Sequence, residues 1–338
     1  MTEQQVPETL SVAEHEHGRP RPGPWARVRQ AHAVLLPLAA IVALVSYFTA
    51  VNPLFLSVDN ALNIGRQSSV LLLVALAETI IILIGSIDLS VGSIVTLVGI
   101  LSASAANKFG WFAGALVGIG IGAVVGLVNG TLLTRLKVPS FLVTLGMLSI
   151  LSGVANQISQ GESILLDSPV LSNIVNHAVL AGVPNVIWIA LVATGLLTLV
   201  AFRTRFGRYL FALGGGEIVA ANAGVPITAY KLAAFVASGT ICGLAGIVLT
   251  GQVGAGTPTA GGGLLLDSIA AVVMGGTALS GGIGGPHRTL LGVLVIALLG
   301  NGMDVTEVNN FTQDMVKGAV IILAVSLTID REKYTFIK

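Results

Sequence analysis

From Phe109 to Thr134 the chain reads FGWFAGALVGIGIGAVVGLVNGTLLT, without a single Asp, Glu, Lys or Arg. A helix needs about 20 mostly apolar residues to cross a hydrocarbon core about 30 Å thick, so this stretch is long enough to do so. Its glycines recur every four residues from Gly114 to Gly126. Helices in lipid associate through close contact between small residues. We therefore expect a transmembrane helix that crosses another helix at short distance.

The composition of the whole chain has the same apolar character. Of 338 residues, 54% are hydrophobic, 10% are charged and 42 are glycine. A soluble domain has about 25% charged residues and about 7% glycine, so a soluble enzyme is excluded. The 17 basic and 16 acidic residues leave a net charge of +1, which gives no sign of nucleic-acid binding. The single cysteine, Cys242, and the five histidines predict neither an intrachain disulfide nor a metal cluster.

Similar apolar stretches occur along most of the chain. They predict an all-α integral membrane protein with about ten transmembrane helices, of which the last two reach full length only with polar flanks. The predicted spans are residues 34–51, 70–87, 89–107, 109–134, 138–161, 185–202, 232–252, 268–283, 289–303 and 316–329.

The basic residues indicate how the chain is oriented. Fourteen of the 17 lie in five segments: Arg19, Arg21, Arg27 and Arg29 before the first span, Arg135 and Lys137 after the fourth, Arg203, Arg205, Arg208 and Lys231 after the sixth, Arg288 after the eighth, and Arg331, Lys333 and Lys338 after the last. With ten spans, all of these segments fall on one side. The opposite loops, 52–62, 160–184 and 253–266, contain neither Lys nor Arg. Basic loops stay in the cytoplasm, so both termini are expected to be cytoplasmic.

The first 30 residues contain Pro20, Pro22 and Pro24 and show no apolar period. They predict a disordered cytoplasmic tail, 1–30, before a transmembrane domain over residues 31–338. A secretory signal is the alternative. Its apolar core is about 7 to 15 residues long, and the first span is longer, so we expect that span to remain as a helix.

Three carboxylates fall within or beside the apolar spans: Glu78, Asp88 and Asp267. Such a group is costly at mid-membrane unless it faces protein or water. Asp88 and Asp267 each precede a new apolar run and are followed by a serine, which predicts helix N-caps at two broken or re-entrant helices. Capping is favoured over substrate contact for both. For Glu78 we expect a partner in a hydroxyl or a neighbouring helix.

The segment between the sixth and seventh spans contains a short helix outside the membrane. Residues 217–223 favour a helix, with three glycines before them at 214–216 and Gly224 and Pro226 after them. A simple linker is the alternative, but a linker needs no capped apolar helix. We expect a contact surface on the cytoplasmic side.

Four segments carry a resemblance to a known family. They are GSIDLSVGS (85–93), NGTLLTRLKVPSFLVTLG (129–146), the stretch from TRFG (204–207) to GVP (224–226), and GGTALSGGIGG (275–285). Together they resemble, in order, the permease subunit of bacterial ATP-binding-cassette importers for monosaccharides of the ribose, xylose and galactose type. The resemblance covers about residues 61–327. The sequence departs from the usual family pattern at two places. Gly85-Ser86 stands where a Gly-Gly pair is common, and Gly284 to Arg288 stands where a Gly-Arg-Gly-type turn is more usual. Neither departure affects the assignment.

The resemblance implies that the 31–338 domain has the permease fold, with a cytoplasmic coupling helix at about 214–226 that docks on a separate ATPase subunit. The matching residues are Gly214, Glu217, Ala220, Ala221 and Gly224. The chain has no G-x-x-x-x-G-K-[ST] phosphate loop, so ATP and Mg are expected on the ATPase and no cofactor on this chain. The other implied partners are an extracytoplasmic sugar-binding protein and a second permease chain, identical or related, in a bacterial inner membrane. No catalytic residue and no metal site are expected.

A pathway for a neutral polyol needs hydroxyl and amide groups and little charge. The candidates are Asp88, Ser90, Ser93, Asn129, Pro139, Ser140, Thr144, Asp267 and Ser268. For each of them, helix packing or capping is the favoured role. Because only 5% of the residues are aromatic, a tight stacking site for sugar is not expected in this chain.

Other functions stay open at this point. A permease of the same kind for a polyol, a nucleoside, a furanosyl signalling molecule or a branched-chain amino acid would look similar, although the IDLSVG motif favours the sugar branch. An ion-coupled secondary transporter would use the three carboxylates, but it would not need the cytoplasmic helix. A membrane enzyme is disfavoured because the five histidines are scattered over the tail and loops.

Overall fold

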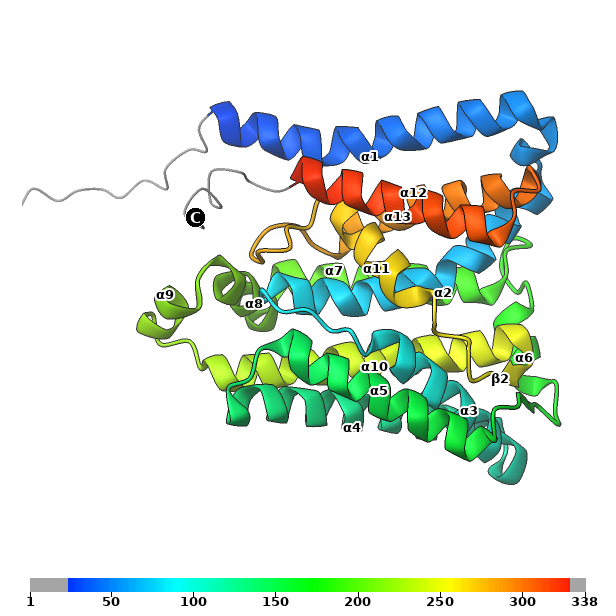
Figure 1. Cartoon of the computed structure of the whole chain (residues 1–338), viewed down its shortest axis with the longest axis horizontal. Helices are drawn as coiled ribbons and strands as arrows, with labels where there is room; N and C mark the ends of the chain where they lie inside the picture. The colour runs from blue at the N-terminus through cyan, green and yellow to red at the C-terminus, as the bar shows by residue number, and fades with distance from the viewer. Residues whose placement is uncertain (1–23, 329–338) are drawn as a thin grey trace, which may run out of the picture.

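The computed structural model describes residues 24–328, which are almost entirely helical. The long helices lie side by side in Figure 1 and run between two ends of the molecule. They are α1 (Pro24–Val51), α2 (Val58–Leu83), α3 (Val91–Phe109), α4 (Trp111–Leu136), α5 (Ser140–Ser159), α7 (Asn185–Arg203), α10 (Ile227–Val253), α12 (Pro286–Val305) and α13 (Asn310–Thr328).

Short elements connect the long helices. At one end lie α8 (Arg205–Gly215) and α9 (Glu217–Asn222), and at the other end lies α6 (Val170–Asn176). The remaining elements are the 3₁₀ helix Pro53–Leu56, the half-length helix α11 (Leu264–Met274), and the strands β1 (Ile164–Leu165) and β2 (Ala255–Gly256), which pair antiparallel.

Eight of the described helices are long and apolar enough to cross a membrane, namely α1, α2, α3, α4, α5, α7, α10 and α12. This confirms a helical protein with many membrane spans. The helix α2 starts earlier than the predicted span 70–87 because a spanning helix can begin in polar residues at the membrane surface. The tail expected at 1–30 is described only from Pro24, where α1 begins, and its residues 1–23 lie outside the described residues.

The eighth predicted span, 268–283, is wrong as a continuous helix. The structure has α11 there, which contains 11 residues and rises about 16 Å, too short to cross the hydrocarbon core. A loop rich in glycine follows, with positive φ angles at Gly276, Gly281, Gly282, Gly284 and Gly285. Side-chain hydropathy does not reveal where such backbone angles end a helix.

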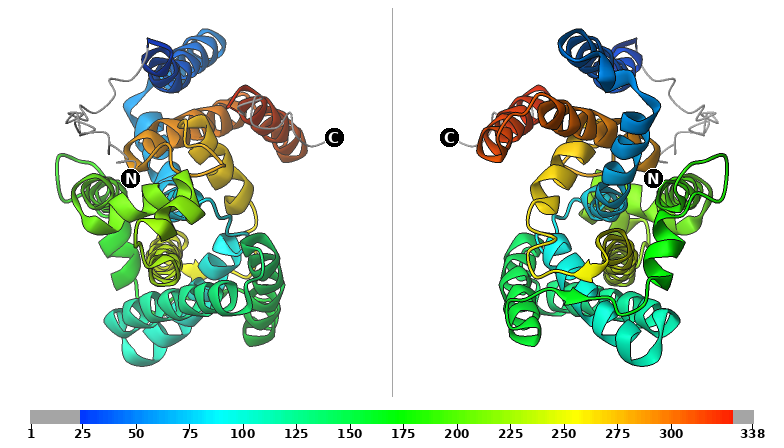
Figure 2. Two further views of the ribbon diagram at one scale, coloured as in Figure 1. Left: turned by 90° about the vertical axis from the view of Figure 1, so that its left-hand side faces the viewer. Right: turned by 90° about the vertical axis from the view of Figure 1, so that its right-hand side faces the viewer.

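The core of the molecule surrounds α2. In the most apolar 18-residue stretch of α2, 83% of the residues are buried. The corresponding stretches are 28% buried in α4 and 22% buried in α5 and in α7. The views along the helices show α1, α12 and α13 on one side of α2 and α3, α4 and α5 on the other (Figure 2). The outer helices expose apolar side chains, as expected for surfaces that face lipid.

The glycine pattern of α4 marks a close crossing with α10, as predicted. A Cβ atom at Gly122 would overlap the carbonyl oxygen of Gly239, and one at Gly126 would overlap that of Phe235. The two backbones are therefore in direct contact. Any larger side chain at these two positions would force α4 and α10 apart.

Candidate functional site

The helix expected at 217–223 is present as α9, and it protrudes from one end of the molecule (Figure 1). The hydroxyl of Thr204 starts the preceding helix α8 by accepting a hydrogen bond from the Gly207 amide at 3.2 Å. Gly224, with φ +79°, ends the turn that follows α9. The sequence could predict α9 because a capping residue at the start of a helix and a glycine at its end act on neighbouring residues only.

The outer face of α9 is apolar. Ile218 is 78% exposed and Val219 is 73% exposed, whereas Ala220 is buried against the rest of the chain. Sequence analysis named Ala220 and Ala221 and missed these two residues. Two β-branched apolar side chains in a segment outside the membrane were the signal that could have found them.

Glu217 has a partner within the chain. Its Oε2 atom lies 2.6 Å from the Nζ atom of Lys231 on α10. This ion pair joins α9 to the first turns of α10. Glu217 therefore holds α9 in place in addition to any contact it makes with a partner.

Three glycine-rich segments meet beneath α8 and α9. A Cβ atom at Gly281 would lie 2.7 Å from the Gly85 nitrogen and 2.8 Å from the Gly214 Cα atom. The Gly282 amide also donates to the Leu83 carbonyl oxygen, at 3.0 Å. The end of α8 thus touches the end of α2 and the loop that precedes α12. A displacement of α9 would be transmitted directly to both.

Residues 84–90 interrupt the helix between α2 and α3, and side chains bind the amides that this break leaves free. The Ile87 amide donates to Ser140 Oγ at 3.1 Å, and the Leu89 amide donates to Thr144 Oγ1 at 3.0 Å. Buried backbone groups in a membrane protein must find such partners. Ser140 and Thr144, which were predicted as candidates for the solute pathway, therefore lie at this break.

Asp88 is not the N-cap of α3, so that prediction is wrong. The N-cap position belongs to Ser90, whose side chain makes no capping bond. Instead, Asp88 Oδ1 accepts from the Ser90 amide at 2.9 Å and from the Ser90 hydroxyl at 2.5 Å. This is a turn closed by the aspartate, two residues before the N-cap of α3.

Residues 84–90 are at the centre of a network of buried hydrogen bonds. Asn129 Nδ2 donates to Ser90 Oγ at 2.9 Å, and the Asp88 amide donates to Glu78 Oε1 at 3.3 Å. Glu78 therefore pairs with backbone, where a hydroxyl or another helix was expected. Within the described residues, Glu78 Oε2 and Asn129 Oδ1 have no hydrogen-bond partner.

Asp267 and Ser268 lie elsewhere and do not join this cluster. The N-cap of α11 is Gly263, so the predicted cap at Asp267 is also wrong. Asp267 Oδ2 lies 3.3 Å from Lys317 Nζ on α13, and Ser268 Oγ donates to the Leu265 carbonyl oxygen of its own helix at 2.8 Å. Ser93 bonds the Ser90 carbonyl oxygen at 2.8 Å, and Pro139 is the N-cap residue of α5. The predicted interruptions themselves are present, as the break at 84–90 and the short helix α11.

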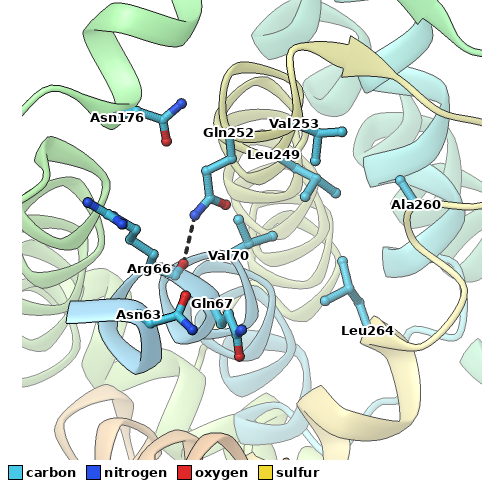
Figure 3. A pocket seen from close by; sticks show the side chains of 10 residues that line it. All are labelled: Asn63, Arg66, Gln67, Val70, Asn176, Leu249, Gln252, Val253, Ala260 and Leu264. Carbon is cyan, nitrogen blue, oxygen red and sulfur yellow. Dashed lines mark hydrogen bonds between the residues drawn. The ribbon is translucent and has the colours of Figure 1, made fainter. Parts of the chain in front are cut away.

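A pocket with both polar and apolar lining residues, of about 380 Å³, lies between the start of α2 and the end of α10 (Figure 3). This is the end opposite α9 (Figure 1). Its polar lining residues are Asn63, Arg66, Gln67, Asn176 and Gln252. Gln252 Nε2 donates to the Arg66 carbonyl oxygen at 2.8 Å, and the guanidinium of Arg66 forms no ion pair with any described residue. The sequence did not lead us to predict this pocket. Arg66, together with the amides of Asn63 and Gln67 just before an apolar span, could have indicated it. The pocket can hydrogen-bond the hydroxyl groups of a polar molecule.

Comparison with known proteins gives consistent results. The family model described as "Branched-chain amino acid transport system / permease component" matches residues 60–325. The chain is 36% identical over 290 residues to the ribose import permease protein RbsC of Haemophilus influenzae, covering 85% of this chain and 90% of that protein. It is 36% identical over 313 residues to RbsC of Escherichia coli, covering 88% and 93%. It is 34% identical over 293 residues to the D-allose transport system permease protein AlsC of Escherichia coli, covering 86% and 89%. No solved structure matches the chain.

Proposed function

This chain belongs to the family of branched-chain amino acid transport system permease components, and from this premise we propose that it is the permease subunit of an ATP-binding-cassette importer for a monosaccharide. The observation that carries the proposal is similarity over more than four fifths of the chain to permeases named for ribose and for D-allose. Both named solutes are monosaccharides. That favours a sugar over the branched-chain amino acids in the family description.

The proposed topology has ten crossings with both termini in the cytoplasm. The segment 255–263, which begins with β2 and continues in turns, makes one crossing together with α11, and α13 makes another in addition to the eight apolar helices. In support, the start of α1 and the end of α13 lie toward the same end of the molecule as α9 (Figure 1). The proposal puts that end on the cytoplasmic side of a bacterial inner membrane, and the basic segments support it because positively charged loops stay on the cytoplasmic side.

The proposed partners are an ATPase subunit, an extracytoplasmic sugar-binding protein and a second permease chain. ATP and Mg belong to the ATPase, and this chain carries no cofactor of its own. The coupling surface consists of α9, where Ile218 and Val219 supply the apolar contact. Gly214 and Ala220 position that surface by packing, Glu217 by ion pairing and Gly224 by ending the turn, while Ala221 is exposed on it.

The proposed mechanism is alternating access. Closure of the ATPase pair moves α9, and the glycine contacts at Gly214 pass this displacement to Leu83 and Gly282. The break at 84–90 follows directly after Leu83 and separates α2 from α3, so these two helices can reorient relative to each other. Asp88, Ser90, Ser93, Asn129, Ser140 and Thr144 hold the break together. Pro139 is the N-cap residue of α5, and Asp267 and Ser268 belong to α11.

The outer pocket is where we place the first contact between the solute and this chain. Its amides and Arg66 can replace the water molecules around the hydroxyl groups of a sugar. No aromatic side chain lines it, so we expect weak binding here and tight binding on the sugar-binding protein. The pocket opens at the end opposite the coupling surface, as an importer requires.

The test is purification of the full chain from its native cells in mild detergent, followed by reconstitution with whatever ATPase and sugar-binding protein accompany it. The proposal predicts ATP-dependent uptake of labelled ribose or a related monosaccharide into liposomes. Ile218→Asp should abolish this uptake and the recovery of the ATPase, because it charges the apolar docking face. Val179→Asp, at an equally exposed apolar residue of the opposite end, is the matched control and should retain both.

Two outcomes would contradict the proposal. Uptake that proceeds without ATP would point to the ion-coupled alternative. ATP-dependent uptake of a branched-chain amino acid but of no sugar would move the chain to another branch of the family.

A further inference from the structure

A second cavity, of about 470 Å³, lies where the last turns of α7 approach the start of α12. Its lining residues are Thr198, Phe202, Gly284, His287 and Arg288. It is at the same end as α9, since α8 follows α7 directly and Gly282 packs on Gly214 of α8. The proposed transport cycle makes no use of it. Gly284 to Arg288 is also the segment where the sequence departs from the usual family pattern.

The cavity contains hydrogen-bond donors that lack acceptors. The Nε atom of Arg288 and the Oγ1 atom of Thr198 are both buried, and neither has a hydrogen-bond partner among the described residues. The ring of His287 packs edge-on against Phe202, with 5.2 Å between the centroids. No carboxylate lines the cavity, and none in the described range forms an ion pair with Arg288.

These features define the chemistry of a suitable ligand. A buried Nε–H group without an acceptor is costly, so the cavity favours a group that brings oxygen acceptors. The positive charge of the guanidinium favours a negatively charged group. A phosphate does both, because the planar fork of an arginine matches two of its oxygens. Thr198 can donate a further hydrogen bond from the opposite wall.

The surface next to the cavity identifies the source of that phosphate. Val192, Leu196, Leu199 and Phe202 are exposed at helical spacing and form an apolar stripe on α7 that leads to the cavity. The stripe from Val192 to Leu199 is about 10 Å long, which suits part of an acyl chain. The cavity lies at the end of two apolar helices, which is the depth of lipid headgroups. Basic pockets between transmembrane helices at this depth bind anionic headgroups.

We propose that this cavity binds an anionic phospholipid, with the phosphate held by Arg288, His287 and Thr198 and an acyl chain against the stripe on α7. The bound lipid joins α7 to the start of α12. That position is next to the loop 281–285, which touches the end of α8. A lipid there therefore stabilises the same junction that carries the displacement of α9.

The experiment is native mass spectrometry of the full chain, purified with whatever partners accompany it, titrated with phosphatidylglycerol or phosphatidylcholine. Retention of phosphatidylglycerol should exceed that of phosphatidylcholine. Arg288→Gln should weaken phosphatidylglycerol binding by about tenfold or more, because a charged hydrogen-bond donor is lost. Arg203→Gln removes the same charge from an exposed arginine near the cavity and should change binding by less than about twofold.

Further measurements distinguish this proposal from poor folding of the variant and from a site for a free anion. Thr198→Val removes only the opposite donor and should weaken binding severalfold without disturbing the guanidinium, which keeps the test valid if Arg288→Gln folds poorly. Equal retention of the two lipids, or equal binding by Arg288→Gln and Arg203→Gln, would overturn the proposal. So would full displacement of the lipid by inorganic phosphate, because the site would then recognise a free anion.

Discussion

At the scale of single residues, the polar groups in the membrane-spanning part of this chain mainly satisfy its backbone. Ser140 and Thr144 bind amides of the break at 84–90, and Asp88 closes the turn that leads into α3. Lipid offers no hydrogen bonds, so the break exists only because these side chains supply them. A permease that must bend at mid-membrane therefore needs hydroxyl and carboxylate groups there, whether or not a solute touches them.

Asp88→Asn should leave folding and uptake largely intact. The amide oxygen of asparagine can accept the same two hydrogen bonds from Ser90 that Asp88 Oδ1 accepts at 2.9 and 2.5 Å. Asp88→Ala leaves the Ser90 amide and hydroxyl without this acceptor and should cost about 1 to 3 kcal/mol of stability. Thermal unfolding in detergent and uptake in liposomes are the measurements. A stable but inactive Asp88→Asn protein would show that the charge itself takes part in transport.

Glu217→Lys should abolish uptake because it places two cations side by side where Glu217 and Lys231 now form a pair at 2.6 Å. The double variant Glu217→Lys with Lys231→Glu restores the pair with its charges exchanged and should recover uptake. An exposed pair is worth at most about 1 kcal/mol, so thermal unfolding should change little in either protein. A double variant that stays inactive would mean that Glu217 contacts the ATPase directly.

At the scale of elements, the important contacts are between backbones. The end of α8, the end of α2 and the loop before α12 meet through Gly214, Gly85 and Gly281. Segments from the sequence motifs therefore converge on one junction, and the motif around Asn129 and Ser140 supplies the hydrogen bonds of the adjacent break. Glycine is required at Gly214 and Gly281 because no space remains for a Cβ atom, and at Gly85 because its φ angle is +72°.

Gly214→Ala and Gly215→Ala form a matched pair for this junction. A Cβ atom at Gly214 would overlap the Leu83 carbonyl oxygen, whereas one at Gly215 meets nothing within 4 Å. Gly214→Ala should destabilise the protein by about 1 to 3 kcal/mol and reduce the coupling of uptake to ATP hydrolysis. Gly215→Ala should be neutral, or stabilising by up to about 1 kcal/mol. Equal behaviour in unfolding and in uptake per ATP hydrolysed would contradict the junction's role.

At the scale of the whole molecule, the two ends have different chemistry. One end has α9, the arginines at 203, 205 and 208 and the cavity at Arg288, and the other has the pocket around Arg66. An importer needs this polarity, because the solute arrives at one face and the energy of ATP hydrolysis at the other. The central position of α2, which reaches from the pocket to the junction at Gly214, connects the two ends.

Membrane-impermeant maleimide labelling tests this orientation. The only cysteine, Cys242, is fully buried, so the unmodified chain should not react and needs no prior cysteine removal. Asn222→Cys on α9 should react only in inside-out vesicles. Ser168→Cys, in the exposed segment before α6, should react only in right-side-out vesicles. The reverse pattern would invert the proposed topology.

The sequence by itself determined the membrane location, most of the spans, a close crossing of α4 with another helix, and the short helix α9. Each of these follows from a local property: the length of an apolar run, the spacing of glycines, or the residues that begin and end a helix. The tertiary structure alone decided where α11 ends, that Asp88 closes a turn where a cap was predicted, and that Glu78 serves the break. It also produced both cavities. The reason is physical, because the partners are far apart in the chain: Ser140 is 53 residues from Ile87, and Gln252 is 186 residues from Arg66. A hydrogen bond or a pocket between such residues exists only after the helices have packed, and no local pattern records it.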